Sequence, residues 1–208
     1  MPGSAASEIP ALAPRVSSKG AAQAALDPIA VLIVVPTLDG GAADAGALEL
    51  VRILCQAGHR AIVVSRAGRL VADVTAAGAE FVALDVGINN PIAMLRNALV
   101  LNRLAREKNC DAIHAFGRAG AWSAFIAARL CGIPFVTSWY KGFQEQNVFK
   151  HLYNGVMARG ARVIAVSDQI AQLINDRYGT PWEKIALGLF LIALIGFGAA
   201  VLRKKKNH

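Results

Sequence analysis

A strand, a glycine-bearing turn and a helix within residues 29–58 constrain the fold of this chain more than any other segment. Residues 29–35 (IAVLIVV) are an unbroken apolar run rich in β-branched side chains, and Pro36 ends it. From Asp44 to Ala57 apolar residues recur at helical spacing, and Gly58 ends that helix. A buried strand, a turn and a helix in this order predict the first unit of a parallel α/β sheet.

The same alternation continues along the chain. After the first unit we expect strands at residues 60–65, 80–84, 111–115, 133–138 and 161–166. We expect helices at 69–77, 91–108, 119–130 and 169–177, and a loop followed by a helix between 139 and 157. Pro91 suits the first turn of its helix, and Ser167 suits an N-cap. Six strands alternating with helices predict a doubly wound, mostly parallel, Rossmann-like sheet.

The two ends of the chain differ from this domain, which we place at residues 28–184. Residues 1–27 are rich in Ala, Pro, Ser and Gly and are expected to form a flexible leader. Residues 185–202 (IALGLFLIALIGFGAAVL) are 18 residues without a charge. As a helix they would be about 27 Å long, close to the ~30 Å hydrocarbon core. We therefore predict a transmembrane helix, with a buried core helix as the alternative, followed by a basic tail at 203–208.

Charge and cysteine content exclude several classes of function. The formal net charge is +8, but the run RKKK at 203–206 supplies four of these charges, so the domain has no nucleic-acid footprint. The three cysteines lie far apart and form no CxxC pair, which is typical of reduced core thiols in a cytosolic protein. The histidines are also scattered, and no spacing of metal ligands is present.

The first candidate site residues lie in the turn after the first strand. Gly40 and Gly41 let backbone N–H groups approach a ligand, and the helix that follows offers its positive dipole end. The pattern is neither GxGxxG nor a Walker loop, which disfavours nicotinamide dinucleotides and P-loop chemistry. A plain turn remains the alternative.

Two later segments are expected at the same carboxyl edge of the sheet. His114 is expected to end the fourth strand, and Arg118 follows it closely. Residues 139–147 follow the fifth strand and combine aromatic, basic and amide side chains, beginning with Trp139, Tyr140, Lys141 and Gly142. Such a loop suits carbohydrate or lipid-headgroup recognition, because rings stack on sugar faces and amides bond hydroxyls. The alternatives are a surface Arg beside a capped strand end, and loop aromatics that pack on the core.

Together these segments resemble the N-terminal half of a family 4 glycosyltransferase of bacterial surface-polysaccharide or lipopolysaccharide assembly. The resemblance covers about residues 29–185. It rests on the first turn and on the runs HAFGRAGAW (114–122), FVTSWYKGF (135–143), YNGVMARG (153–160) and VIAVSDQI (163–170). It implies one lobe of the GT-B architecture, in which two Rossmann-like domains enclose the site in the cleft between them.

The resemblance also implies roles for the candidate residues. The N-terminal lobe binds the acceptor, a saccharide or lipid-linked acceptor, and the sugar comes from a nucleotide-sugar donor without a further cofactor or metal. Gly40 and Gly41 are expected near the donor phosphate and the acceptor, while His114, Arg118 and residues 139–142 line the cleft. Relatives often have a His-Gly pair after the fifth strand. This chain has Tyr140, Lys141 and Gly142 there, so the role of that His has no counterpart, and Lys141 is assigned to a phosphate or acceptor group.

The family's C-terminal, donor-binding domain has no counterpart in the sequence. Stabilising the departing donor phosphate is an electrostatic task of that domain, so we expect little or no transfer by this chain alone. Three hypotheses follow: a split enzyme that works with a separate donor-domain protein, a non-catalytic membrane-anchored saccharide-binding module, and a truncated, inactive gene product.

Membrane orientation follows from two conflicting signals. The positive-inside rule would place the RKKK run in the cytoplasm and the domain outside. Nucleotide-sugars and free thiols belong inside, and no signal peptide is visible in the sequence. We expect a cytoplasmic domain held at the bacterial inner membrane by a single C-terminal span.

Overall fold

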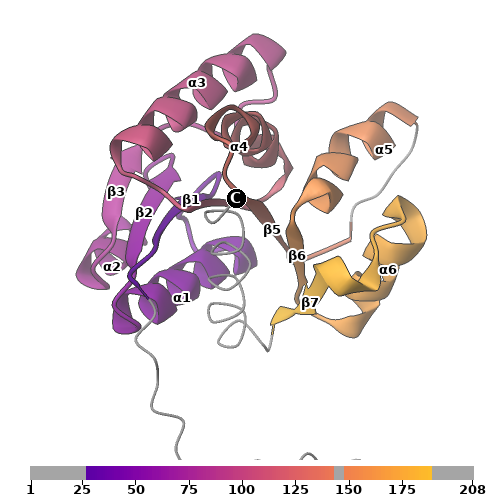
Figure 1. Cartoon of the computed structure of the whole chain (residues 1–208), viewed down its shortest axis with the longest axis horizontal. Coiled ribbons are helices and arrows are strands. Elements are labelled where there is room, and N and C mark those ends of the chain that lie inside the picture. Colours follow the sequence, from indigo (N-terminus) through magenta and orange to yellow (C-terminus); the bar gives the residue numbers. More distant parts are fainter. Residues whose placement is uncertain (1–26, 143–147, 189–208) are drawn as a thin grey trace, which may run out of the picture.

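The computed structural model describes residues 27–142 and 148–188, which fold into alternating strands and helices (Figure 1). The strands are β1 (Ala30–Val34), β2 (Arg60–Ser65), β3 (Glu80–Ala83), β4 (Ala112–Phe116), β5 (Phe135–Trp139), β6 (Arg162–Ala165) and β7 (Ile185–Leu187). The helices are α1 (Ala42–Gln56), α2 (Val71–Ala76), α3 (Pro91–Glu107), α4 (Arg118–Cys131), α5 (Val148–Asn154) and α6 (Asp168–Tyr178). Two 3-10 segments, η1 (Gly155–Arg159) and η2 (Trp182–Lys184), precede β6 and β7.

All seven strands are parallel, in the order β3-β2-β1-β4-β5-β6-β7. The chain leaves β1 toward β2 and β3, then returns through β4 toward the opposite edge. This confirms the predicted doubly wound, Rossmann-like sheet and places its switch point between β1 and β4. The leader predicted at residues 1–27, apart from residue 27, and the basic tail predicted at 203–208 lie outside the described residues.

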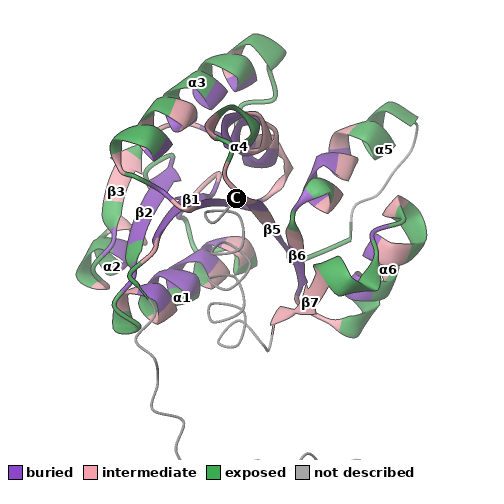
Figure 2. Ribbon diagram, viewed as in Figure 1, coloured by how far each residue is buried: buried purple, intermediate pink, exposed green. Residues whose placement is uncertain are grey.

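The central strand β1 is buried on both faces, as its unbroken apolar run predicts. Leu32 and Val34 point into the cluster beneath α3 and α4, while Ile33 and Val35 point toward α1 and α2. This alternation follows from the two-residue period of a strand. Figure 2 shows the central strands β1, β4 and β5 largely buried and the helices exposed on their outer sides. The strand β1, which leads to the switch point, is therefore covered on both faces.

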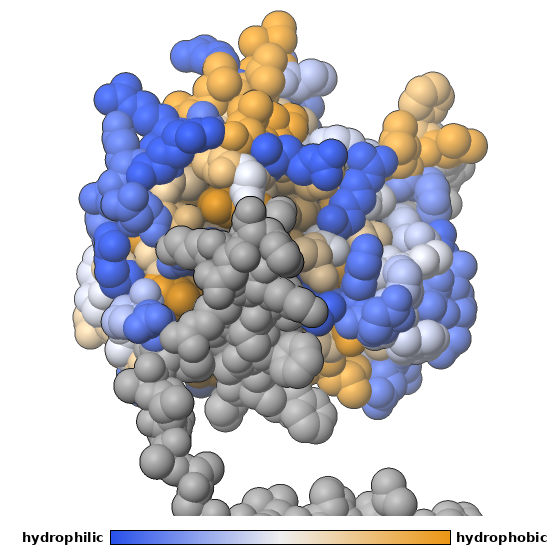
Figure 3. Space-filling view, viewed as in Figure 1, coloured by the Kyte–Doolittle hydropathy of each residue, from blue (hydrophilic) through white to orange (hydrophobic). Residues whose placement is uncertain are grey.

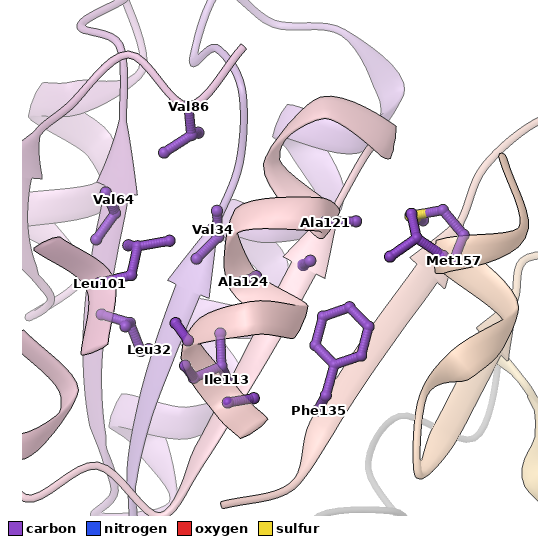
Figure 4. Packing of buried hydrophobic residues seen from close by; sticks show 14 of the residues in the cluster. Leu32, Val34, Val64, Val86, Leu101, Ile113, Ala121, Ala124, Phe135 and Met157 are labelled. Carbon is purple, nitrogen blue, oxygen red and sulfur yellow. The ribbon is translucent and has the colours of Figure 1, made fainter. Parts of the chain in front are cut away.

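Helix α4 packs unusually close to the sheet because its buried residues are all small. A Cβ on Gly120 would lie only 3.1 Å from a methyl group of Val34. Figure 4 shows Ala121 and Ala124 beside the side chains of the central strands. The buried set is Gly120, Ala121, Ser123, Ala124, Ala127 and Ala128. Close packing fixes the start of α4, and with it Arg118, next to the end of β1.

The helix starts follow the chemistry predicted for them. The side chain of Asn90 accepts hydrogen bonds from the N–H groups of Ile92 (2.9 Å) and Ala93 (3.2 Å), and Pro91 occupies the first turn of α3. Ser167 caps α6 by accepting a hydrogen bond of 3.3 Å from Ile170 N–H. Both caps satisfy N–H groups that have no partner within the helix.

The predicted transmembrane helix at 185–202 is corrected at its start. Ile185–Leu187 form strand β7, which pairs with β6 and satisfies the backbone groups of that neighbour. Residues 189–202, the rest of the predicted helix, lie outside the described residues. Within 27–142 and 148–188, no helix is both long enough and apolar enough to span a bilayer.

Candidate site at the carboxyl edge of the sheet

Four neighbouring strands, β2, β1, β4 and β5, end at the switch point and place their following segments side by side. Ligands of open α/β sheets bind in the crevice at this edge. The turn after β4 lies directly against the end of β1, because a Cβ on Gly117 would lie 3.2 Å from Pro36. Gly117 has a φ of +87°, a conformation that favours glycine. The segments that follow these strands therefore define the candidate site.

The first turn is organised around the carboxylate of Asp44. Its Oδ2 accepts hydrogen bonds of 3.0 Å from the N–H groups of Asp39, Gly40 and Gly41, and Thr37 Oγ1 donates to it at 3.2 Å. The side chain of Asp44 is buried. A carboxylate at a helix start also complements the helix dipole. Gly40 and Gly41 are exposed at the edge, but their N–H groups are engaged by Asp44, which leaves none for a donor phosphate in this conformation.

Two arginines that the sequence analysis missed flank this turn. Arg69 donates a hydrogen bond from Nε to the carbonyl of Asp39, and Arg66 Nη2 lies 3.6 Å from an Asp39 carboxylate oxygen. A Cβ on Gly40 would collide with the guanidinium of Arg69. Glycine at this position, with a φ of +104°, lets the arginine cover the turn. Both arginines lie within four residues of the end of β2. Examining the residues that follow every predicted strand, as was done for the first, fourth and fifth strands, would have found them.

His114 lies in the middle of β4 rather than at its end, which corrects the predicted position. Its Nε2 lies 2.8 Å from Ser138 Oγ, and its ring stacks on Phe116 with 4.6 Å between centroids. His114 and Ser138 are both buried. Burial lowers the pKa of His114 to about 3, so the imidazole is neutral at physiological pH. In this structure His114 supports the site from within the sheet.

Arg118 is the first residue of α4 and joins this helix to α5. Its Nη1 donates a hydrogen bond of 2.9 Å to Asn154 Oδ1, and Asn154 is fully buried. Nearby, Tyr153 donates a hydrogen bond of 2.6 Å to Asn89 in the β3–α3 loop. Burial raises the pKa of Tyr153, and the charge of Arg118 opposes that shift. No sequence pattern predicts that Asn154 binds Arg118 or that Asn89 binds Tyr153.

The four candidates at and after the end of β5 divide into buried and exposed residues. Trp139 is fully buried, and its Nε1 donates a hydrogen bond of 3.0 Å to the Met157 carbonyl, so its ring is not available to stack on a sugar in this conformation. Tyr140 is half-buried and lies over Gly46 of α1. Lys141 and Gly142 are exposed. The predicted aromatic and amide residues at 143–147 lie outside the described residues.

Around the ends of β2, β1, β4 and β5, the described charged side chains that reach the surface are mostly basic. Arg66, Arg69 and Lys141 are exposed and Arg118 is half-buried. Asp39 is bound by Arg66, and Asp44 is buried beneath the turn. Among residues 27–142 and 148–188, no three His, Cys, Asp or Glu side chains are grouped to hold a metal ion. This arrangement suits binding of anionic or polyhydroxyl molecules.

Comparisons with known proteins agree with this geometry. The family model described as Glycosyltransferase Family 4 matches residues 43–187. A glycosyltransferase from Rickettsia africae is similar in structure, with 28% sequence identity, a TM-score of 0.67, and coverage of 77% of this chain and 42% of that chain. The search of curated proteins found no match.

Two more distant neighbours show the fold alone. Anabaena HepE, in a complex with UDP-glucose, has 17% identity and a TM-score of 0.60, over 76% of this chain and 43% of that chain. The UDP-N-acetylglucosamine 2-epimerase from Rickettsia bellii has 14% identity and a TM-score of 0.52, over 76% of this chain and 44% of that chain. The present chain thus spans less than half the length of these neighbours.

Proposed function

Because this chain belongs to glycosyltransferase family 4, as a match across residues 43–187 shows, we propose that its sheet edge binds the acceptor of a sugar transfer from a nucleotide-sugar. The observation that supports this proposal is the strand order β2-β1-β4-β5, because four cations lie in the segments that follow β2, β4 and β5. These cations are Arg66, Arg69, Arg118 and Lys141.

The charge of the edge indicates which acceptors it favours. The cations follow three of these four strands, β2, β4 and β5, while the two carboxylates of the turn after β1 are bound to Arg66 or buried beneath backbone N–H groups. A positive surface beside glycines attracts phosphate and leaves room for a sugar ring. We therefore propose a lipid-linked saccharide, whose phosphate Lys141 and Arg118 would bind, as the acceptor class. The buried Trp139 has no direct part in this contact.

The donor side of the reaction is proposed to lie outside this chain. The chain spans less than half of the glycosyltransferase from Rickettsia africae. In this proposal, the groups that bind the nucleotide-sugar and stabilise its departing phosphate belong to further residues or to a separate protein. Transfer then requires both halves, because electrostatic stabilisation of the leaving group dominates such reactions.

We propose a cytoplasmic location at the bacterial inner membrane for the domain. The described cysteines Cys55, Cys110 and Cys131 are free thiols, which suit a reducing compartment. Burial raises the pKa of Cys110 to about 11, so this thiol stays protonated and unreactive. Nucleotide-sugars belong to the same compartment.

Acceptor binding is tested with the purified chain and a labelled, short-chain polyprenyl diphosphate saccharide in equilibrium dialysis. We expect Lys141→Gln to weaken binding about five- to tenfold, since one charge-assisted contact is lost. Lys184→Gln is the matched control. Lys184 is also exposed, but it precedes β7 and so lies at the amino ends of the strands, away from the proposed binding edge. Equal affinities for both variants would contradict the proposed binding edge.

Transfer is tested separately with labelled nucleotide-sugars and the same acceptor. Turnover by the chain alone would contradict the proposal that the donor-binding groups lie outside this chain. Turnover only after adding lysate of the source organism would support it, and loss of that turnover in Lys141→Gln would connect it to this edge. Acceptor binding with no transfer under either condition would favour the non-catalytic saccharide-binding module.

A further inference from the structure

Among the described residues, exposed large apolar side chains are concentrated on three helices and one loop. Nine of the ten exposed large hydrophobic residues in the described chain belong to α3, α4, α5 or the loop before α3. Figure 3 shows hydrophobic atoms projecting over α3 and over α5, with hydrophilic atoms between them. The nine are Ile88, Ile92, Leu95, Leu99, Val100, Leu130, Val148, Phe149 and Leu152.

Helix α3 has apolar residues on two opposite faces. Met94, Ala98, Leu101 and Ala105 face the core and are buried. On the outer side Ile92, Leu95 and Leu99 follow one another at spacings of three and four residues, which aligns them in a single stripe. Ile92 is 73% exposed, so packing within the described domain does not explain the stripe.

Helix α5 presents a second apolar projection at its start. Val148 and Phe149 lie in its first turn, and Leu152 follows one turn later. Phe149 is 84% exposed, a high value for a phenylalanine in a folded domain. The first turns of α3 and α5 both follow the carboxyl ends of strands. The two projections therefore lie near the same edge of the sheet as the candidate site.

The helices that carry these projections are strongly basic. Together α3, α4, α5 and η1 contain seven Arg or Lys residues and a single acidic residue, Glu107, which pairs with Arg103 at 2.7 Å. The remaining helices, α1, α2 and α6, contain five Asp or Glu residues and two Arg residues. Positive charge and exposed apolar side chains thus coincide on the same helices.

We propose that the first turns of α3 and α5 dock on an anionic lipid bilayer, with Ile92, Leu95, Val148 and Phe149 inserting between lipid headgroups. Basic residues beside the insertion, such as Arg96 and Lys150, bind the lipid phosphates. A bilayer accepts two separate apolar projections, whereas a stable protein interface needs one contiguous, complementary apolar core. This proposal does not depend on the proposed sugar transfer. It would bring the candidate site to the surface where a lipid-linked molecule resides.

Vesicle co-sedimentation of the full chain tests this docking. Wild-type protein is expected to sediment with vesicles of phosphatidylglycerol and phosphatidylcholine, and far less with phosphatidylcholine alone. The double substitution Ile92→Ser with Phe149→Ser is expected to weaken binding at least about tenfold. Trp182→Ser is the matched control, since Trp182 is exposed (52%) but lies in η2, away from these helices. Arg96→Gln with Lys150→Gln should weaken binding to anionic vesicles only.

Two results would overturn the proposal. If the apolar run at 189–202 alone accounts for membrane binding, the Ile92→Ser, Phe149→Ser protein will sediment as well as the wild type. If the face instead binds a second copy of the chain, analytical ultracentrifugation without lipid will show a dimer that the same double substitution abolishes. Unchanged circular dichroism and urea unfolding of the variants will confirm that the loss is not due to misfolding.

Discussion

His114 Nε2 and Ser138 Oγ are joined by a hydrogen bond of 2.8 Å between the adjacent strands β4 and β5. Both side chains are buried at the centre of the sheet. The histidine is neutral there, because burial lowers its pKa to about 3. This pair therefore connects the stability of the fold to pH while remaining away from the site's surface.

The pH dependence of stability follows from this pKa. The unfolded chain binds the proton more tightly, with a pKa near 6.5, so the free energy of unfolding falls as the pH drops from about 6.5 toward 3. The slope from this one group is at most about 1.4 kcal/mol per pH unit. Above pH 6.5 the contribution is constant.

His114→Gln isolates this contribution, because glutamine can still bond Ser138 but does not titrate. Urea unfolding of both proteins between about pH 7.5 and 4.5 should show the wild type losing stability more steeply below pH 6.5. Carboxylates affect both proteins alike and cancel in the comparison. Parallel curves would mean that His114 gains a proton without cost, contrary to its burial.

The carboxylate of Asp44 is predicted to hold the first turn in place. Asp44→Ala removes the acceptor of three backbone N–H groups and should lower the free energy of unfolding by about 1–3 kcal/mol. Asp168→Ala is the control, because Asp168 is also in a first helical turn, while Ser167 caps that helix. Its effect should stay within about 0.5 kcal/mol. Similar losses for both variants would show that only the helix dipole matters.

Tyr140 and Gly46 are predicted to depend on each other. A Cβ on Gly46 would collide with the ring and hydroxyl of Tyr140. Gly46→Ala should therefore destabilise the protein by about 1–3 kcal/mol, although alanine favours a helix by about 1 kcal/mol. In a Tyr140→Leu background the same substitution should become neutral or stabilising. A double-mutant cycle in urea measures this change of sign, and additive effects would mean that the ring is free to leave α1.

The sequence predicted the central sheet well because its elements are specified locally. The apolar run of β1, Pro91 and the Ser167 cap each act within a few residues. Strand β7 was missed, since three residues at a sheet edge become a strand only through pairing with β6. In the sequence, residues 185–187 continue without a break into the apolar run at 189–202, and this longer run predicted a helix.

The candidate site was predicted less completely, for a physical reason. Strand ends correctly indicated Gly40, Gly41, Arg118 and Lys141 as residues of one edge. Whether a side chain at that edge faces solvent depends on packing from distant segments. Trp139 packs in the core, and its N–H donates to the carbonyl of Met157, 18 residues later.

Trp139→Phe distinguishes a packing role from sugar stacking. The indole donates to the Met157 carbonyl, which also accepts a hydrogen bond of 2.6 Å from Thr137 Oγ1, so phenylalanine loses one of two bonds. We expect the free energy of unfolding to fall by about 1–2 kcal/mol, with acceptor affinity in equilibrium dialysis unchanged. Lys141→Gln should do the reverse, weakening binding at constant stability. If Trp139→Phe weakened acceptor binding without affecting stability, the ring must reach the ligand, and the strand end would have to open when the acceptor binds.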